Sequence, residues 1–61
     1  MVVIETIRAG YSPEQVVDKT MTVGELVDYL QRNYYSDEPI LLSFDNGYTY
    51  GHLNERMIDE I

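Results

Sequence analysis

Ile40-Leu-Leu-Ser-Phe-Asp-Asn-Gly-Tyr-Thr-Tyr-Gly-His-Leu53 is the stretch of sequence that decides the fold. At its centre lies Asn46-Gly47, the strongest short signal for a β-hairpin, because a two-residue type I′ turn requires positive φ at both central residues. Runs of β-forming side chains flank this turn on both sides. We therefore predict a hairpin over residues 40–53 whose register is fixed by the turn.

This register assigns every side chain of the hairpin to one of two faces, because successive residues of a strand point to opposite sides. The predicted pairs are Phe44 with Thr49, Ser43 with Tyr50, Leu42 with Gly51, Leu41 with His52, and Ile40 with Leu53. The face expected to join the core carries Ile40, Leu42, Phe44, Thr49, Gly51 and Leu53. The opposite face carries Leu41, Ser43, Asp45, Tyr48, Tyr50 and His52.

The second face is the candidate binding surface. Tyrosine supplies a large, stiff contact area together with a hydroxyl group, and it is enriched at protein interfaces. The chain holds six tyrosines, one phenylalanine and no tryptophan. We expect Tyr48, Tyr50, His52 and Asp45 to contact a partner. The plainer interpretation is that tyrosine is simply a good strand residue, or that a C-terminal helix covers this face.

A helix over about residues 22–34 precedes the hairpin. The sequence Thr22-Val-Gly-Glu25 is a capping box, in which each of the two polar side chains accepts from the other residue's backbone N–H. Arg32 follows Asp28 at the favourable i,i+4 spacing. The apolar side chains recur at helical spacing and form one stripe: Val23, Leu26, Val27, Leu30 and Tyr34.

The remaining segments are shorter. Residues 2–9 are predicted to form a strand covered on both sides, by the core and by a second subunit. Ser12-Pro-Glu-Gln15 is a second capping box and indicates a short helix from Pro13 to about Asp18, although β-branched residues leave a strand over residues 15–21 as the alternative. Asn54 is expected to cap a last turn whose apolar side chains fold back on the core: Met57, Ile58 and Ile61.

Together these elements predict one α+β domain over residues 1–61, with a small antiparallel or mixed sheet and the 22–34 helix packed across one face. A 61-residue chain lies near the lower limit for a single hydrophobic core. It contains no cysteine, so disulfides cannot stabilise it, and one histidine makes a structural zinc site a poor fit. We therefore expect a homo-oligomer.

The net charge limits which kinds of partner the chain can bind. Eleven acidic residues against four Lys and Arg give a formal charge of −7. Binding to a phosphate backbone depends on Lys and Arg, which this chain largely lacks. The acidity either serves solubility or faces a basic partner protein. No membrane span or signal peptide is apparent, and together with the lack of cysteine this leads us to expect a cytoplasmic protein.

The candidates for catalysis have low specificity. Asp18, Asp37, Asp45 and His52 are the residue types that a metal-dependent nuclease or a general base would use. Clusters of carboxylates arise by chance in so acidic a chain, and His52 is predicted to face Leu41, which offers no orienting carboxylate. We predict no cofactor, apart from Mg²⁺ if the protein were a nuclease.

Four segments resemble small proteins carried by prophages of gut Firmicutes: Gly10-Tyr-Ser-Pro-Glu, Met21-Thr-Val-Gly-Glu-Leu-Val-Asp-Tyr-Leu, Asp37-Glu-Pro-Ile and Asp45-Asn-Gly-Tyr-Thr-Tyr-Gly. The resemblance spans about residues 10–53. It implies a counter-defence role of the anti-CRISPR type, in which a CRISPR nuclease such as Cas9 is inhibited by protein binding or by nicking of supercoiled DNA. It also implies a PC4-like alternative for the fold, which would require a strand over residues 15–21. The alternative function is a non-enzymatic interaction or oligomerisation module.

Overall fold

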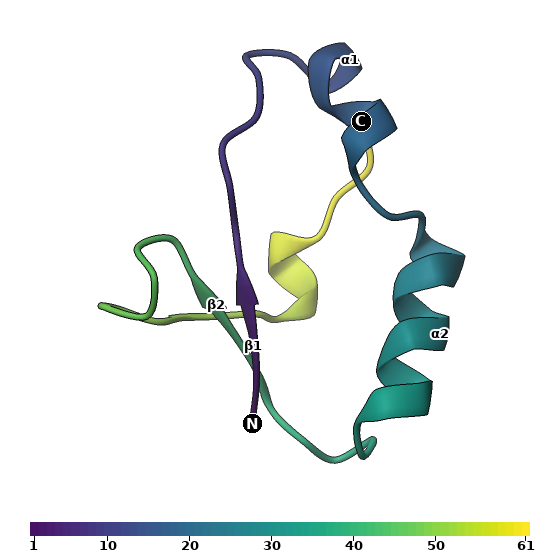
Figure 1. Ribbon diagram of the computed structural model, residues 1–61, viewed down its shortest axis with the longest axis vertical. Coiled ribbons are helices and arrows are strands. Elements are labelled where there is room, and N and C mark those ends of the chain that lie inside the picture. Colours follow the sequence, from purple (N-terminus) through teal and green to yellow (C-terminus); the bar gives the residue numbers. More distant parts are fainter. The chain divides into compact units, whose positions relative to one another are not determined.

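A computed structural model describes residues 1–61 as two compact units, residues 1–7 with 38–61 and residues 8–37. The first unit holds a three-stranded sheet and a short 3₁₀ turn, and the second holds the helices (Figure 1). The class is therefore α+β, as predicted. The elements are β1 (Val2–Glu5), α1 (Pro13–Val16), η1 (Val17–Lys19), α2 (Val23–Asn33), β2 (Ile40–Ser43), β3 (Gly51–His52) and η2 (Glu55–Met57).

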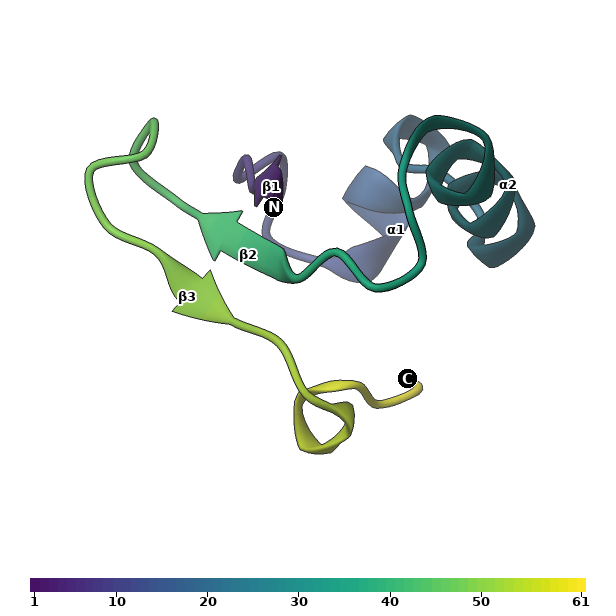
Figure 2. The same cartoon turned by 90° about the horizontal axis from the view of Figure 1, so that it is seen from below.

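The sheet is mixed, with strand order β1-β2-β3. β1 pairs with β2 in parallel, from Val2 opposite Ile40 to Glu5 opposite Ser43. β2 pairs with β3 antiparallel, as Figure 2 shows. The central strand thus belongs to the segment that the Asn-Gly turn organises.

The predicted hairpin register is confirmed where the strands pair. Leu41 lies opposite His52, and Leu42 lies opposite Gly51. The turn residues also adopt the expected backbone, with φ of 57° at Asn46 and 83° at Gly47. The local chemistry of the turn is therefore sufficient to align the two strands.

The paired strands are shorter than predicted. β2 ends at Ser43 and β3 begins at Gly51, so Phe44 and Thr49 form no ladder pair and neither do Ser43 and Tyr50. Residues 43–50 are termed the hairpin end below. In this segment side-chain oxygens, rather than a partner strand, accept hydrogen bonds from backbone N–H groups, those of Asn46, Gly47 and Thr49.

Burial is confined to one side of the first strand and to the start of the hairpin end. Val2 is the one buried apolar residue, and Ser43 is fully buried. On the other side of β1, Val3 is half exposed, and Ile7 beyond the strand is largely exposed. The chain itself therefore covers one side of this segment, the strand ends at Glu5 rather than Ala9, and cover of the other side by a second subunit stays a prediction.

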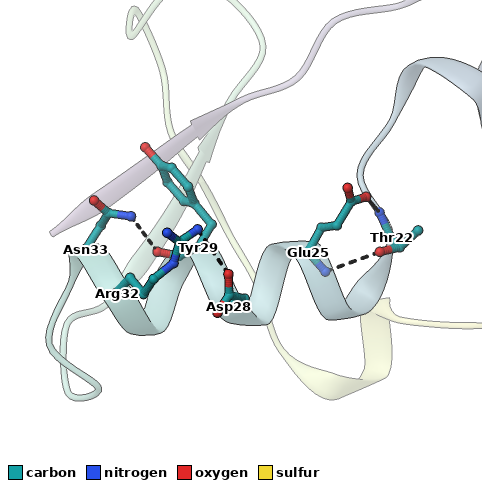
Figure 3. Close-up of polar contacts among 6 residues, drawn as sticks. All are labelled: Thr22, Glu25, Asp28, Tyr29, Arg32 and Asn33. Carbon is teal, nitrogen blue, oxygen red and sulfur yellow. Dashed lines mark hydrogen bonds and ion pairs between the residues drawn. The ribbon is translucent and has the colours of Figure 1, made fainter.

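Helix α2 forms where the capping box predicted it (Figure 3). Glu25 N–H donates to Thr22 Oγ1 at 3.2 Å, and Thr22 N–H donates to Glu25 Oε1 at 2.9 Å. The helix also carries the predicted Asp28–Arg32 ion pair at 3.0 Å. None of its residues is buried, and its packing across the sheet stays a prediction.

Residues 13–19 are helical, which decides between the two interpretations of this segment in favour of the short helix. Gln15 accepts from the N–H groups of Tyr11 (2.6 Å) and Ser12 (3.4 Å) through its side-chain oxygen. The strand over residues 15–21 that a PC4-like fold would require is absent.

The C-terminal segment begins as predicted but does not fold back on a core. Asn54 Oδ1 accepts from Arg56 N–H at 3.0 Å and starts the single turn η2. The apolar side chains that follow are exposed rather than packed: Met57, Ile58 and Ile61.

Candidate binding surface at the hairpin end

The hairpin end is organised around the Ser43 side chain. Its hydroxyl oxygen accepts from Gly47 N–H at 2.8 Å and donates to Asp45 Oδ1 at 3.4 Å. Because Ser43 is fully buried, these bonds satisfy a polar group that would otherwise be costly to remove from water. One short side chain therefore holds both the turn glycine and the carboxylate beside it.

Asp45 holds the returning strand. Its two carboxylate oxygens accept from Thr49 N–H at 2.9 Å and from the Thr49 hydroxyl at 2.7 Å. These bonds, from the Thr49 N–H first and its hydroxyl second, lower the pKa of Asp45 because they stabilise the ionised carboxylate. Asp45 is thus occupied in shaping the loop as well as being exposed on the surface.

The first strand braces the same region from the side. Thr6 donates to the Ser43 carbonyl through its N–H at 2.8 Å and through its hydroxyl at 3.1 Å. Glu5 accepts from Asn46 N–H at 2.9 Å through its side chain. Residues some forty positions apart in the sequence therefore fix the base and the turn of the hairpin end together.

The predicted binding residues lie on the exposed surface of this braced structure. Tyr48 is 87% exposed and Tyr50 is 57% exposed. His52 is also exposed and lies opposite Leu41, as predicted. No C-terminal helix covers Tyr48 or Tyr50, so that part of the plainer interpretation is wrong.

Tyr50 lies close to the turn. Its hydroxyl would be 3.0 Å from a Cβ added at Gly47. The Tyr50 side chain therefore leans along the hairpin toward the turn glycine, and substitution of Gly47 would displace it.

Phe44 belongs to the exposed surface, although the alternation pattern predicts it in the core. It is 68% exposed, because no part of the chain covers this face of the hairpin beyond the end of β2. Its ring lies beside Gly51, 3.7 Å from the place where a Cβ would stand. Leu53, also predicted in the core, is 41% exposed. The aromatic surface below denotes Tyr48 and Tyr50.

No metal-binding cluster is assembled from the carboxylates. Nowhere do three or more His, Asp or Glu side chains come together in a way that could hold a metal ion. Asp18 lies in η1, Asp37 precedes the sheet unit, and both are exposed. Of the four weak catalytic candidates, Asp45 is the one with a defined role, and that role is structural.

The comparisons give no relatives. No protein-family model matches the chain, and neither a curated protein nor a solved structure is significantly similar to it. None of the helices has the length and apolar character needed to cross a membrane.

Proposed function

We propose that this chain is a protein-binding module that uses the aromatic surface at its hairpin end. The observation that supports this most directly is the combination of exposed aromatic side chains with a polar network that fixes the backbone beneath them. Binding is favoured when contact groups are large and already ordered, because less conformational entropy is lost. Exposed aromatic side chains on a braced loop meet both conditions.

A basic protein is the partner that this surface suits. The sequence from Ile40 to Leu53 contains no Lys or Arg, so the hairpin offers nothing to neutralise phosphates. Conversely, arginine side chains of a partner would find aromatic faces for cation–π contacts and a carboxylate at Asp45. The net charge of −7 would also accelerate encounter with a basic surface.

The resemblance to prophage proteins suggests which basic partner to test first. We propose counter-defence, with the chain occupying the basic nucleic-acid channel of a CRISPR nuclease such as Cas9. The acidic, aromatic hairpin end is consistent with that mode of inhibition. If Cas9 is not the partner, the same surface still supports an interaction module with another role.

The test measures binding to purified Cas9, with and without guide RNA, over a salt series. Wild-type protein should bind and inhibit cleavage, and its affinity should fall as salt rises. The double variant Tyr48→Ala/Tyr50→Ala should lose binding while its circular dichroism spectrum is retained. Tyr11→Ala is the matched control, because Tyr11 is a fully exposed tyrosine outside the hairpin.

A second assay addresses the nicking alternative directly. Supercoiled plasmid is incubated with the protein and Mg²⁺, with and without EDTA, and resolved on a gel. Binding alone predicts an unchanged plasmid. Metal-dependent conversion to open circles, lost on substitution of one of the candidate aspartates, would replace the binding mechanism by an enzymatic one.

A further inference from the structure

The turn residue Asn46 carries a chemical liability that the hairpin end suppresses. It is exposed and is followed by Gly47, whose lack of a side chain leaves its backbone nitrogen unshielded. Asparagine is a thermolabile residue because its amide can be lost by attack of the following backbone nitrogen. We propose that Asn46 is a latent deamidation site and that the Ser43 hydroxyl keeps it intact in the folded protein.

The reaction at this site requires the Gly47 nitrogen as nucleophile. That nitrogen loses its proton and attacks Cγ of the Asn46 side chain, forming a C–N bond that closes a five-membered succinimide. The side-chain nitrogen leaves as ammonia, taking up a proton. Water then opens the ring at one of its two carbonyls, giving aspartate or isoaspartate. The net change is one water consumed and one ammonia released.

In the folded protein a hydrogen bond makes the Gly47 nitrogen less available for this attack. Gly47 N–H donates to Ser43 Oγ at 2.8 Å, so the proton that must leave is held in a hydrogen bond. Ser43 is fully buried, which keeps water from competing for that proton. On the other side of the same residue, Asn46 N–H donates to Glu5 Oε1 at 2.9 Å, so the peptide groups before and after Asn46 are both held by hydrogen bonds.

Asn46 differs from the other two asparagines of the chain. Asn33 Nδ2 donates to the Tyr29 carbonyl at 2.7 Å, and Asn54 Oδ1 accepts from Arg56 N–H. Neither is followed by glycine. Both therefore serve as internal controls that should stay intact under the same conditions.

Loss of the amide at this position would disturb the whole hairpin end. A new carboxylate at position 46 would add a third negative charge next to Asp45 in the sequence and to Glu5, which accepts from the Asn46 N–H, and like charges repel. Isoaspartate would also lengthen the backbone of a turn that depends on two consecutive positive φ angles. Deamidation would thus loosen the backbone that carries the aromatic surface.

The experiment compares the deamidation rate of wild type and Ser43→Ala at mildly alkaline pH, folded and in urea. Peptide mapping by mass spectrometry and isoaspartate detection follow Asn46, with Asn33 and Asn54 in the same digest. Folded wild type should deamidate severalfold more slowly than folded Ser43→Ala, whereas the two should be equal in urea. Equal rates in the folded proteins would overturn the proposal.

A second measurement covers the case in which Ser43→Ala fails to fold. Amide hydrogen exchange in wild type should show Gly47 N–H protected relative to the urea-unfolded chain, and folded wild type should deamidate severalfold more slowly than the same chain in urea. A Gly47 amide that exchanges at the unfolded rate, or a folded deamidation rate equal to that in urea, would contradict the role assigned to Ser43.

Discussion

At the scale of single residues, Ser43, Asp45 and Gly47 have distinct tasks in a segment of five positions. The Ser43 hydroxyl accepts a hydrogen bond from the Gly47 N–H, and the Asp45 carboxylate accepts one from the Thr49 N–H. Gly47 itself adopts a positive φ that other residues rarely adopt. Each of these interactions is local, so a single substitution can remove one and leave the others. The substitutions should therefore have different effects on the free energy of unfolding and on its dependence on pH.

The two hairpin glycines provide a matched pair of substitutions. Gly47→Ala should lower the free energy of unfolding by about 1–2 kcal/mol, because alanine is strained at φ 83° and its Cβ would meet the Tyr50 hydroxyl at 3.0 Å. Gly51→Ala should change it by less than about 1 kcal/mol, because its Cβ would find ordinary contacts no closer than 3.7 Å. Thermal unfolding of the two variants is the measurement, and equal destabilisation would contradict it.

Asp45 should make the hairpin end sensitive to acid. Because its pKa in the folded protein is lowered below 3.8, its contribution to stability is present above that pH and is lost as pH falls through the lowered value. The Thr49 amide signal in NMR should therefore titrate below pH 3.8. In Asp45→Asn this transition should disappear, while Glu25, whose pKa is lowered by the Thr22 N–H, should still titrate in helix α2. Persistence of the Thr49 transition in Asp45→Asn would assign it to another group.

At the scale of elements, helix α2 is stabilised mainly by local contacts. Its capping box, its ion pair and its end at Asn33 all lie within one segment, and no side chain of the helix is buried. A helix of 11 residues is marginal in water on such contacts alone. Its helix content should therefore respond directly to local substitutions.

Gly24 and Thr22 test this dependence in opposite directions. Gly24→Ala should stabilise the helix by about 0.5–1 kcal/mol, since a Cβ there meets nothing within 4 Å and alanine is the better helix former. Thr22→Ala should destabilise it by about 1 kcal/mol, because the Glu25 N–H loses its acceptor. Ellipticity at the helical minimum reports both, and a response of the same sign from the two variants would show that local contacts do not control the helix.

The elements also show what the sequence can predict and what it cannot. The Asn46-Gly47 turn and the Thr22–Glu25 capping box depend on neighbours in the chain, so the hairpin register and the start of helix α2 were predictable. The parallel pairing of β1 with β2 and the bonds from Glu5 and Thr6 to the hairpin join distant segments, which no local pattern specifies.

The candidate binding surface also contains residues that the local sequence pattern predicts and residues that it does not. Alternation predicts Tyr48, Tyr50 and His52 on one face, and all three are exposed, whereas their contact with a partner stays a prediction. Alternation also assigns Phe44 to the correct face, beside Leu42 and Gly51, but it does not predict that this face stays uncovered. Ser43 offered one signal in the sequence: a short hydroxyl residue four positions before a turn glycine can bond its N–H, as serine does in turns.

At the scale of the whole molecule, the chain has far more exposed apolar surface than buried apolar surface. Val2 is the one buried apolar residue, whereas the α2 stripe includes Val23 at 82%, Leu26 at 38% and Val27 at 47% exposure. A stable 61-residue fold without disulfides needs more burial than this. Self-association through apolar surface would supply it, and we propose the α2 stripe as the surface used, with packing of the same stripe across the sheet as the alternative.

Self-association makes stability depend on protein concentration. The melting temperature of wild type should rise with concentration, since assembly stabilises the folded state by mass action, and sedimentation should detect a species larger than the monomer. Val27→Lys places a charge in the stripe and should abolish both effects, whereas Thr20→Lys adds the same charge at an exposed position outside the helix and should preserve them. A monomer whose melting temperature is independent of concentration would exclude self-association. Equal loss from the two lysine variants would trace assembly to net charge, because only the position of the lysine distinguishes them.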